Sequence, residues 1–285
     1  MKKNILVTGA NGYIGSHIIS ELSKHQEKFN ITGVDFNNSN IKKDINFINY
    51  NILEQSNNFN LYQELNSPDI LLHLAWQDGF THNADSHILK LSQHFAFIKN
   101  LIDNGCIHIA VAGSFREYGK CNGKVTEDHI CETDNNYSLA KYTLNKALKL
   151  YTQNKGICFQ WLRFFTPYGD DKLNNSILSK ILKWEKEGKD SFPFTEGKEQ
   201  YDYIHVDMLA KYVVATISQT KIDGEINICT GNPTELKVMV ENFIKDNNLK
   251  IKPIFGAYKS RNYDSPIIYG DNTKILKILE GYNAE

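Results

Sequence analysis

The first turn of this 285-residue chain is built on three glycines. Residues 9–15 read GANGYIG, and Gly9 also ends the apolar run 4–9, NILVTG, which we predict to be a buried strand. The same glycines open the segment 12–28, in which isoleucine and leucine recur at helical spacing. Glycine permits a tight turn and lets the backbone approach a pyrophosphate, whose charge is favoured at a helix N-terminus. The order of strand, glycine turn and helix therefore predicts a dinucleotide-binding site.

An acidic residue follows this turn at the spacing expected for such a site. Asp35 comes twenty residues after Gly15, near the end of a second predicted strand at 31–36. A carboxylate there can accept hydrogen bonds from an adenosine ribose and repels a 2′-phosphate. We therefore expect NAD as the cofactor, with NADP as the alternative, and a strong preference for NADPH would contradict the Asp35 argument.

Apolar strands alternate with helical patterns through the first half of the chain. They indicate a parallel sheet that helices cover on both faces. The fold class expected is α/β, a doubly wound parallel Rossmann sheet with a smaller α/β substrate lobe, and ligands bind such sheets at the carboxyl ends of the strands. Further strands are predicted at 46–52, 69–75, 107–114 and 158–165, and helices within 83–104 and at 136–153.

The pattern loosens beyond residue 165. The later segments are a helix at 176–188, a polar connection at 191–200, a helix at 205–219, a strand at 225–230 and a mixture of helix and loop over 234–285. We assign 1–165 and 205–230 to an NAD(P)-binding domain, and 166–204 and 231–285 to the substrate lobe.

Charge and cysteine content exclude several classes of protein. The 32 basic and 33 acidic side chains leave a net charge of −1, without the basic excess of a general nucleic-acid or anionic-membrane binder. The apolar run 70–76 is far shorter than the roughly 20 residues that span a bilayer. The five cysteines are widely spaced and form no CxxC, which fits a reducing compartment. We expect a cytoplasmic protein that binds neither nucleic acid nor membrane.

A tyrosine and a lysine are spaced for proton transfer. Tyr137 and Lys141 lie four residues apart in the predicted helix 136–153, so the phenol and the ammonium share one face. A nearby cation lowers the pKa of a phenol toward the range useful in acid–base catalysis. Ser114 ends the preceding strand, where its hydroxyl could bind the same substrate oxygen. The alternatives are a surface lysine on an amphipathic helix and a serine that merely forms a turn.

Three histidines follow the fourth predicted strand without forming a plausible metal site. His82, His87 and His94 are spaced by five and seven residues, which does not place all three on one helix face, and no Cys or Glu completes a set of ligands. We expect no metal. His82 is either a solvated loop residue or a hydrogen-bond partner of a sugar hydroxyl.

Together these motifs resemble the extended short-chain dehydrogenase/reductases, the NAD-dependent epimerase/dehydratase family, which act mostly on nucleotide sugars. The resemblance spans almost the whole chain. The residues that carry it are TGANGYIG at 8–15, Asp35, HLA at 73–75, Ser114 four residues before Tyr118-Gly119, Tyr137 with Lys141, RFFTPYG at 163–169, YDYIHVDMLA at 201–210, and Arg261 with DNTK at 271–274.

The resemblance implies a role for individual residues. The catalytic group becomes Ser114, Tyr137 and Lys141. Cofactor contacts are implied for Gly9, Asn11, Gly12, Tyr13, Ile14, Gly15, Asp35, Asn51, Ile52, Leu74 and Ala75, together with Tyr137 and Lys141. Substrate contacts are implied for Trp76, His82, Ser114, Tyr137, Thr166 and Arg261. A homodimer through the helices at 83–104 and 136–153 is implied as well.

Departures from the family pattern reduce the number of reactions expected of this chain. Phe115 and Arg116 stand where 4,6-dehydratases carry Asp-Glu, and Arg116 also stands where 3,5-epimerase–reductases carry a cysteine. Tyr201 replaces a frequent phosphate-binding arginine, for which Arg261 or Lys198 could compensate. Hydride chemistry without elimination remains, by a 4-ketoreductase or a 4-epimerase.

The segment 73–83, HLAWQDGFTHN, resembles the branch of short nucleotide-sugar 4-ketoreductases, such as those that form dTDP-6-deoxytalose or dTDP-fucose. The expected reaction is NAD(P)H-dependent reduction of the C4 ketone of a nucleotide-linked, preferably dTDP-linked, 4-keto-6-deoxyhexose. Its product would be a deoxysugar donor for surface polysaccharide. A 4-epimerase and a non-catalytic NAD-sensing protein are the alternatives.

Overall fold

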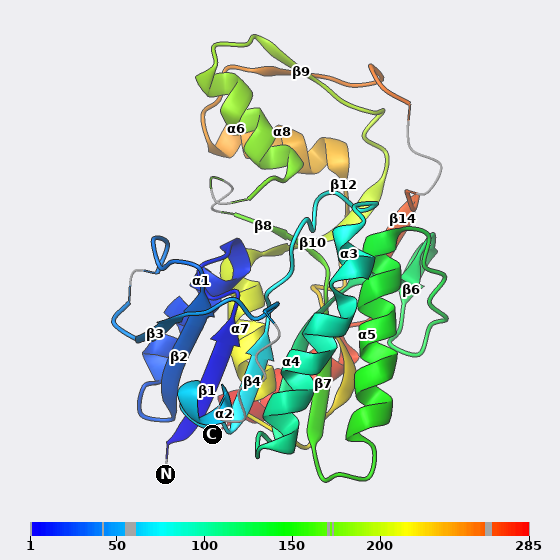
Figure 1. Ribbon diagram of the computed structural model, residues 1–285. Coiled ribbons are helices and arrows are strands. Elements are labelled where there is room, and N and C mark those ends of the chain that lie inside the picture. The colour runs from blue at the N-terminus through cyan, green and yellow to red at the C-terminus, as the bar shows by residue number, and fades with distance from the viewer. Residues whose placement is uncertain are drawn as a thin grey trace.

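The computed structural model describes residues 2–41, 43–54, 61–169, 172, 174–259 and 264–284. Within these residues a seven-stranded parallel sheet forms the core of the larger lobe (Figure 1). Its strands, in spatial order, are β11 (Gly224–Ile228), β7 (Cys158–Phe164), β5 (His108–Ser114), β4 (Ile70–His73), β1 (Lys3–Thr8), β2 (Phe29–Asp35) and β3 (Asn46–Asn49). This arrangement confirms the predicted doubly wound α/β class.

Helices cover both faces of this sheet (Figure 1). One face carries α1 (Tyr13–Leu22), α7 (Val206–Ile217) and α9 (Thr273–Asn283), and the other carries α2 (Leu61–Glu64), α4 (Leu91–Asp103) and α5 (Asn136–Thr152). Because helices cover both faces, the central strand β5 is buried at every position. Among the helices that the structure describes, none combines the length and apolar character needed to cross a bilayer.

The direction of winding reverses beside β1. Its neighbours are β2 on one side and β4 on the other, so the chain leaves the sheet centre in opposite directions. Ligands of doubly wound sheets bind outside the carboxyl ends of the strands at such a reversal. The glycine turn, Asp35 and the segment after β4 all lie at this edge, and Ser114 ends the next strand, β5.

A smaller lobe lies beyond the carboxyl ends of the large sheet (Figure 1). Its helices α6 (Ile177–Lys186) and α8 (Leu236–Asp246) share an apolar cluster with β9 (Ser191–Pro193), which pairs with β13 (Lys252–Ile254). A second sheet connects the lobes. It runs β12 (Pro233–Glu235), β10 (Gln200–His205), β14 (Ile267–Gly270), β6 (Asn122–Val125), with β8 (Thr166–Tyr168) also paired to β10.

Several of these strands differ from the expectation. The polar segment 191–200 contains β9 and the start of β10, and the region expected to mix helix and loop contains β12, β13 and β14. These strands are only three to six residues long, and most of their partners are distant in sequence, as in the pairing of Ile267 with Asn122. A strand of so few residues shows little periodicity. Its local sequence also gives no sign of a partner that lies so far along the chain.

Candidate active site

The glycine turn has the geometry of a phosphate-binding loop. Gly12 is the N-cap of α1, and its N–H donates to the Gly9 carbonyl over 3.1 Å. A Cβ atom on Gly15 would lie 2.0 Å from that carbonyl oxygen, so only glycine fits there. Strand β1 and helix α1 therefore approach closely and leave the backbone of the turn facing outward at the helix N-terminus.

Asp35 lies directly against this turn. One carboxylate oxygen accepts the Asn11 N–H over 3.0 Å, and the other accepts the Phe36 N–H over 2.8 Å. The Asn11 side chain in turn donates to Asn37 over 2.7 Å. The end of β2 and the glycine turn are thus fixed to each other, and the partly exposed carboxylate faces the space beside the turn.

A cavity of about 270 Å³ opens at this edge of the sheet. Its lining includes eight residues singled out in the sequence: Gly9, Gly12, Asp35, Asn51, Ile52, Leu74, Ala75 and Trp76. The sequence missed Val34, Phe36, Tyr50, Leu53, Gln77 and His94, which complete the lining. A glycine turn for a pyrophosphate, a carboxylate for a ribose and apolar walls for a base fit a dinucleotide in this space.

Ser114 and Tyr137 meet beside the carboxyl end of β5. Ser114 is the last residue of β5, Tyr137 lies in the first turn of α5, and the Ser114 hydroxyl is close enough to the phenol to act on its pKa. Burial raises the pKa of Tyr137 to about 12, although the Ser114 hydroxyl and the charge of Arg116 oppose the increase. The expected lowering of this pKa by Lys141 is therefore wrong: burial raises the pKa, and the groups that oppose the increase are Ser114 and Arg116. At neutral pH the phenol keeps its proton and can donate it.

Lys141 is buried one helical turn further along α5. Its ammonium donates to the Ala112 carbonyl over 2.7 Å and lies 3.9 Å from the centre of the Trp76 ring. Burial lowers the pKa of Lys141 to about 7, and the charge of Glu117 opposes this shift. The lysine therefore titrates near neutral pH, in contact with a residue that lines the cavity.

Three aromatic rings from the segment between β4 and α4 surround Tyr137. The His82 ring stacks on it with centroids 5.8 Å apart, and the Tyr137 N–H donates to the His82 carbonyl over 2.8 Å. Trp76 and His87 meet the phenol ring edge to face. The Trp76 indole N–H donates to His87 Nδ1 over 3.1 Å, so His87 donates from Nε2 to the Thr81 carbonyl.

A buried polar chain passes behind Trp76. The Thr8 hydroxyl is hydrogen-bonded to His73, whose other ring nitrogen is bonded to His94 over 3.0 Å. His94 stacks on Trp76 with centroids 4.5 Å apart. Burial holds the pKa of His73 well below its usual range and lowers that of His94 to about 3, so both rings are neutral. In the described part of the chain no group of three or more His, Cys, Asp or Glu side chains is placed to hold a metal ion.

The remaining sequence candidates have different surroundings. The Tyr13 hydroxyl donates to the Gly169 carbonyl over 2.5 Å, which ties α1 to the start of the smaller lobe, and Ile14 packs against the core. Thr166 lies in β8, and its buried hydroxyl has no hydrogen-bond partner among the described residues. Arg261 lies outside the described residues. A hollow of only about 10 Å³ is lined by Arg116 and Tyr201 together with the carboxylates Asp134 and Asp264.

Comparisons with known proteins agree with this geometry. The model of the NAD dependent epimerase/dehydratase family matches residues 5–229. The dTDP-6-deoxy-L-talose 4-dehydrogenase (NAD(+)) of Aggregatibacter actinomycetemcomitans is 35% identical over 273 residues, which cover 94% of this chain and 99% of the relative. The dTDP-4-dehydro-6-deoxyglucose reductase of Escherichia coli is 24% identical and covers 97% and 90% of the two chains.

Solved structures share the fold at lower identity. One is the UDP-glucuronic acid 4-epimerase of Bacillus cereus in complex with UDP-glucuronic acid and NAD. It superposes with a TM-score of 0.81 at 24% identity, over 97% of this chain and 93% of that one.

Proposed function

The chain belongs to the NAD dependent epimerase/dehydratase family, and we propose that it reduces the C4 ketone of a nucleotide-linked 4-keto-6-deoxyhexose, dTDP-linked in the first instance. It is an NAD-dependent enzyme. The observation that carries the proposal is the meeting of the Ser114 and Tyr137 hydroxyls beside buried Lys141, next to the cavity that fits the dinucleotide.

The chain's own groups complete a reduction when NADH supplies the hydride to C4. Tyr137 carries its proton at neutral pH because its pKa is raised to about 12, so it donates that proton to the C4 oxygen. Ser114 binds the same oxygen and fixes its position relative to the phenol. Lys141, held against Trp76, provides positive charge at the cofactor side of the site. The remaining cofactor contacts proposed are those along the glycine turn and at Asp35.

The relatives support a C4 reaction on a dTDP-sugar. The first relative is named for oxidation at C4 of dTDP-6-deoxy-L-talose by NAD⁺, and the reverse of that oxidation is reduction of a C4 ketone. The second is named as a reductase of a dTDP-4-dehydro-6-deoxy sugar. Phe115 and Arg116 supply no acid and base for elimination, which favours hydride transfer alone.

The substrate is proposed to bind between the two lobes. Residues 1–165 and 205–230 would bind the cofactor, and 166–204 and 231–285 would complete the sugar-nucleotide site. The contacts we propose come from Trp76, His82, Ser114, Tyr137, Thr166 and Arg261. Arg116 adds a cation to the hollow that it shares with Tyr201. Since Tyr201 stands where the family often has a phosphate-binding arginine, Arg116 is a candidate for part of that task.

A cofactor-oxidation screen tests the proposal. The purified chain is mixed with NADH and with dTDP-, GDP-, CDP- or UDP-linked 4-keto-6-deoxyhexoses, and the absorbance of the reduced nicotinamide is followed. Stoichiometric oxidation with the dTDP-sugar is expected. A 4-epimerase would instead convert a sugar nucleotide to its C4 epimer without net consumption of NADH. No NADH oxidation with any of these 4-keto sugars would contradict the proposal.

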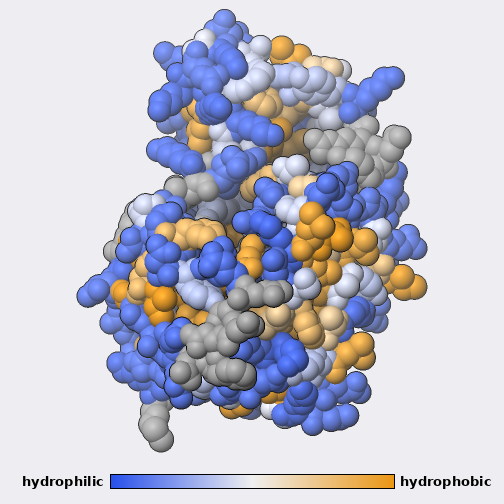
Figure 2. All heavy atoms as spheres, in the orientation of Figure 1, coloured by the Kyte–Doolittle hydropathy of each residue, from blue (hydrophilic) through white to orange (hydrophobic). Residues whose placement is uncertain are grey.

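A cytoplasmic homodimer is the proposed state of the enzyme. Figure 2 shows apolar side chains gathered over α3 (Ser86–Leu89) and α5, where Leu89 and Leu139 are exposed. Association through α4 and α5 would cover part of this surface, and light scattering in solution measures the mass directly. The product would serve as a deoxysugar donor for surface polysaccharide.

A further inference from the structure

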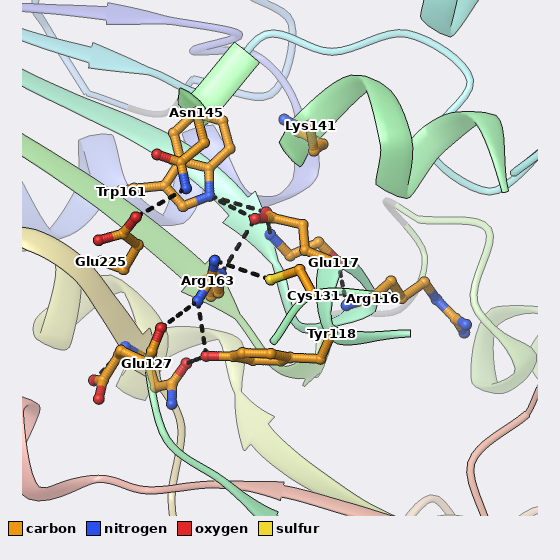
Figure 3. Close-up of polar contacts among 12 residues, drawn as sticks. Arg116, Glu117, Tyr118, Glu127, Cys131, Lys141, Asn145, Trp161, Arg163 and Glu225 are labelled. Carbon is orange, nitrogen blue, oxygen red and sulfur yellow. Dashed lines mark hydrogen bonds and ion pairs between the residues drawn. The ribbon is translucent and has the colours of Figure 1, made fainter. Parts of the chain in front are cut away.

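A fully buried carboxylate lies next to the site and has no part in the proton transfer described above. Glu117 follows Ser114 in the short 3-10 helix Phe115–Tyr118 and is 0% exposed. Its Oε1 accepts the Ser114 backbone N–H over 2.7 Å. The Trp161 indole N–H donates to both of its oxygens, over 2.9 and 3.0 Å (Figure 3). Glu117 therefore holds the backbone of a proposed catalytic residue.

Arg163 fixes this carboxylate from the next strand, β7. Its Nε donates to Glu117 over 3.2 Å, and only 2% of its surface is exposed. One terminal nitrogen donates to the Tyr118 hydroxyl and to the Glu127 carbonyl, each over 3.0 Å (Figure 3). Both charges are thus held in one geometry by hydrogen bonds on several sides.

Stability alone is a weak reason for this ion pair. Burial raises the pKa of Glu117, and the Arg163 charge opposes that shift, so the pair is maintained against the cost of desolvation. Well-packed apolar side chains often replace buried ion pairs without loss of stability. The position of the pair, beside Ser114, therefore points to a role in the site.

The end of β5 is held from two sides by opposite charges. The Lys141 ammonium binds the Ala112 carbonyl over 2.7 Å, and two residues later Glu117 binds the Ser114 N–H. Gly113 between them leaves the room that this requires. A Cβ atom there would lie 2.2 Å from the Trp161 indole nitrogen and 2.8 Å from the Glu117 carboxylate. The strand end, the carboxylate and the ammonium therefore form one packed unit.

We propose that Glu117, fixed by Arg163, is a positioning residue of this site: it holds Ser114 in register with Tyr137 and supplies the negative charge that balances the buried Lys141 ammonium. The effect of Glu117 on kcat rests on the proposed function. Its effect on the pKa of Lys141 can be measured without any substrate.

The charge balance around Lys141 can be followed group by group. His73 from β4 and His94 from α4 are neutral, because burial lowers both of their pKa values. Tyr137 on α5 keeps its proton because its pKa is raised. Trp76 contributes only the face of its ring. Glu117, although paired with Arg163, raises the Lys141 pKa, and removing its charge lowers that pKa further.

Tryptophan fluorescence measures this without substrate. The Lys141 ammonium lies over Trp76, so its deprotonation changes the indole emission. The emission of each protein is followed against pH and compared with that of the same protein carrying Lys141→Met. The difference between the two curves is the contribution of Lys141 deprotonation. In Glu117→Gln the midpoint is expected at least about half a pH unit below that of the wild type. Asp202→Asn removes another buried carboxylate, away from Lys141, and should leave the midpoint in place. An unchanged midpoint in Glu117→Gln overturns the charge-balancing role.

Glu117→Asp tests the hold on Ser114, even where Glu117→Gln does not fold. The shorter side chain keeps the charge but withdraws it from the Ser114 N–H. We expect kcat for NADH oxidation to fall at least about tenfold with little change in KM for NADH, and the fluorescence midpoint to stay within about 0.3 units. A wild-type kcat would overturn the positioning role. A wild-type enzyme inactive on every sugar would refute the proposed function and leave the fluorescence result to decide the inference.

Discussion

The ammonium of Lys141 lies 3.9 Å from the centre of the Trp76 ring, and its hydrogen bond goes to the Ala112 carbonyl. The lysine is 2% exposed, so this contact replaces most of its hydration. A cation at the face of an indole is favourable, but burial still lowers the pKa of Lys141 to about 7. The site therefore holds a group whose charge the folded protein disfavours, as functional sites often do.

Replacing Lys141 should stabilise the protein in a pH-dependent way. The unfolded lysine binds its proton up to about pH 10.5, whereas the folded one releases it near pH 7. Wild-type stability therefore rises with pH between these values. Lys141→Met removes the cost, so its free energy of unfolding in urea should exceed that of the wild type by roughly 2–4 kcal/mol at pH 7 or below. The gain should fade toward pH 10, and a variant less stable than the wild type at pH 6 would contradict this.

Removing the phenolic hydroxyl should abolish turnover without unfolding the chain. Tyr137→Phe takes away the proton donor while keeping the ring that packs against Trp76 and His82. Loss of a general acid costs roughly 10²–10⁴-fold, so kcat should fall by at least that factor. Tyr151→Phe is the matched control on the same helix, since its hydroxyl binds Asp103 rather than the site. Turnover close to wild type in Tyr137→Phe would refute its role.

Cofactor choice should depend on the charge of Asp35. The variant Asp35→Asn keeps an oxygen that can accept the Asn11 N–H but no longer repels a 2′-phosphate. The ratio of kcat/KM for NADH to that for NADPH should fall about tenfold or more. The two ratios are measured on one substrate by cofactor oxidation. A wild-type enzyme that already prefers NADPH, or an unchanged ratio, would remove this role from Asp35.

The parallel sheet and the cofactor edge could be predicted because their signals are local. The central strands β1, β4 and β5 are largely apolar runs, and the glycine turn lies within seven residues of sequence. The second sheet could not, because β6 and β14 each have only four residues and pair across more than half of the chain. Pairing between distant short strands is decided by tertiary packing rather than by local pattern.

The same distinction applies within the site. Tyr137 and Lys141 are found from their spacing on one helix, but their pKa values depend on burial, which the spacing does not reveal. The sequence does not single out Glu117, because its ion-pair partner Arg163 lies forty-six residues later in another strand. His94 was considered only as a metal ligand, and its stacking on Trp76 requires the packing of α4 against the loop after β4.

Arg116 should affect substrate binding more than the chemical step. Its side chain lines the small hollow shared with Tyr201, and the role proposed for it is to bind an anionic group of the sugar nucleotide there. Its charge also lowers the pKa of Tyr137, but burial has already raised that value to about 12. The phenol therefore stays protonated at pH 7 with or without Arg116, and kcat should change little.

The variant Arg116→Gln tests this separation between binding and chemistry. KM for the nucleotide sugar should rise about tenfold, while KM for NADH stays near its wild-type value. Arg116→Lys keeps the charge but not the planar fork, so its KM for the nucleotide sugar should lie between those of the wild type and Arg116→Gln. Because a uniform loss of binding raises KM alone, a large fall in kcat with an unchanged KM would place Arg116 in the chemical step instead.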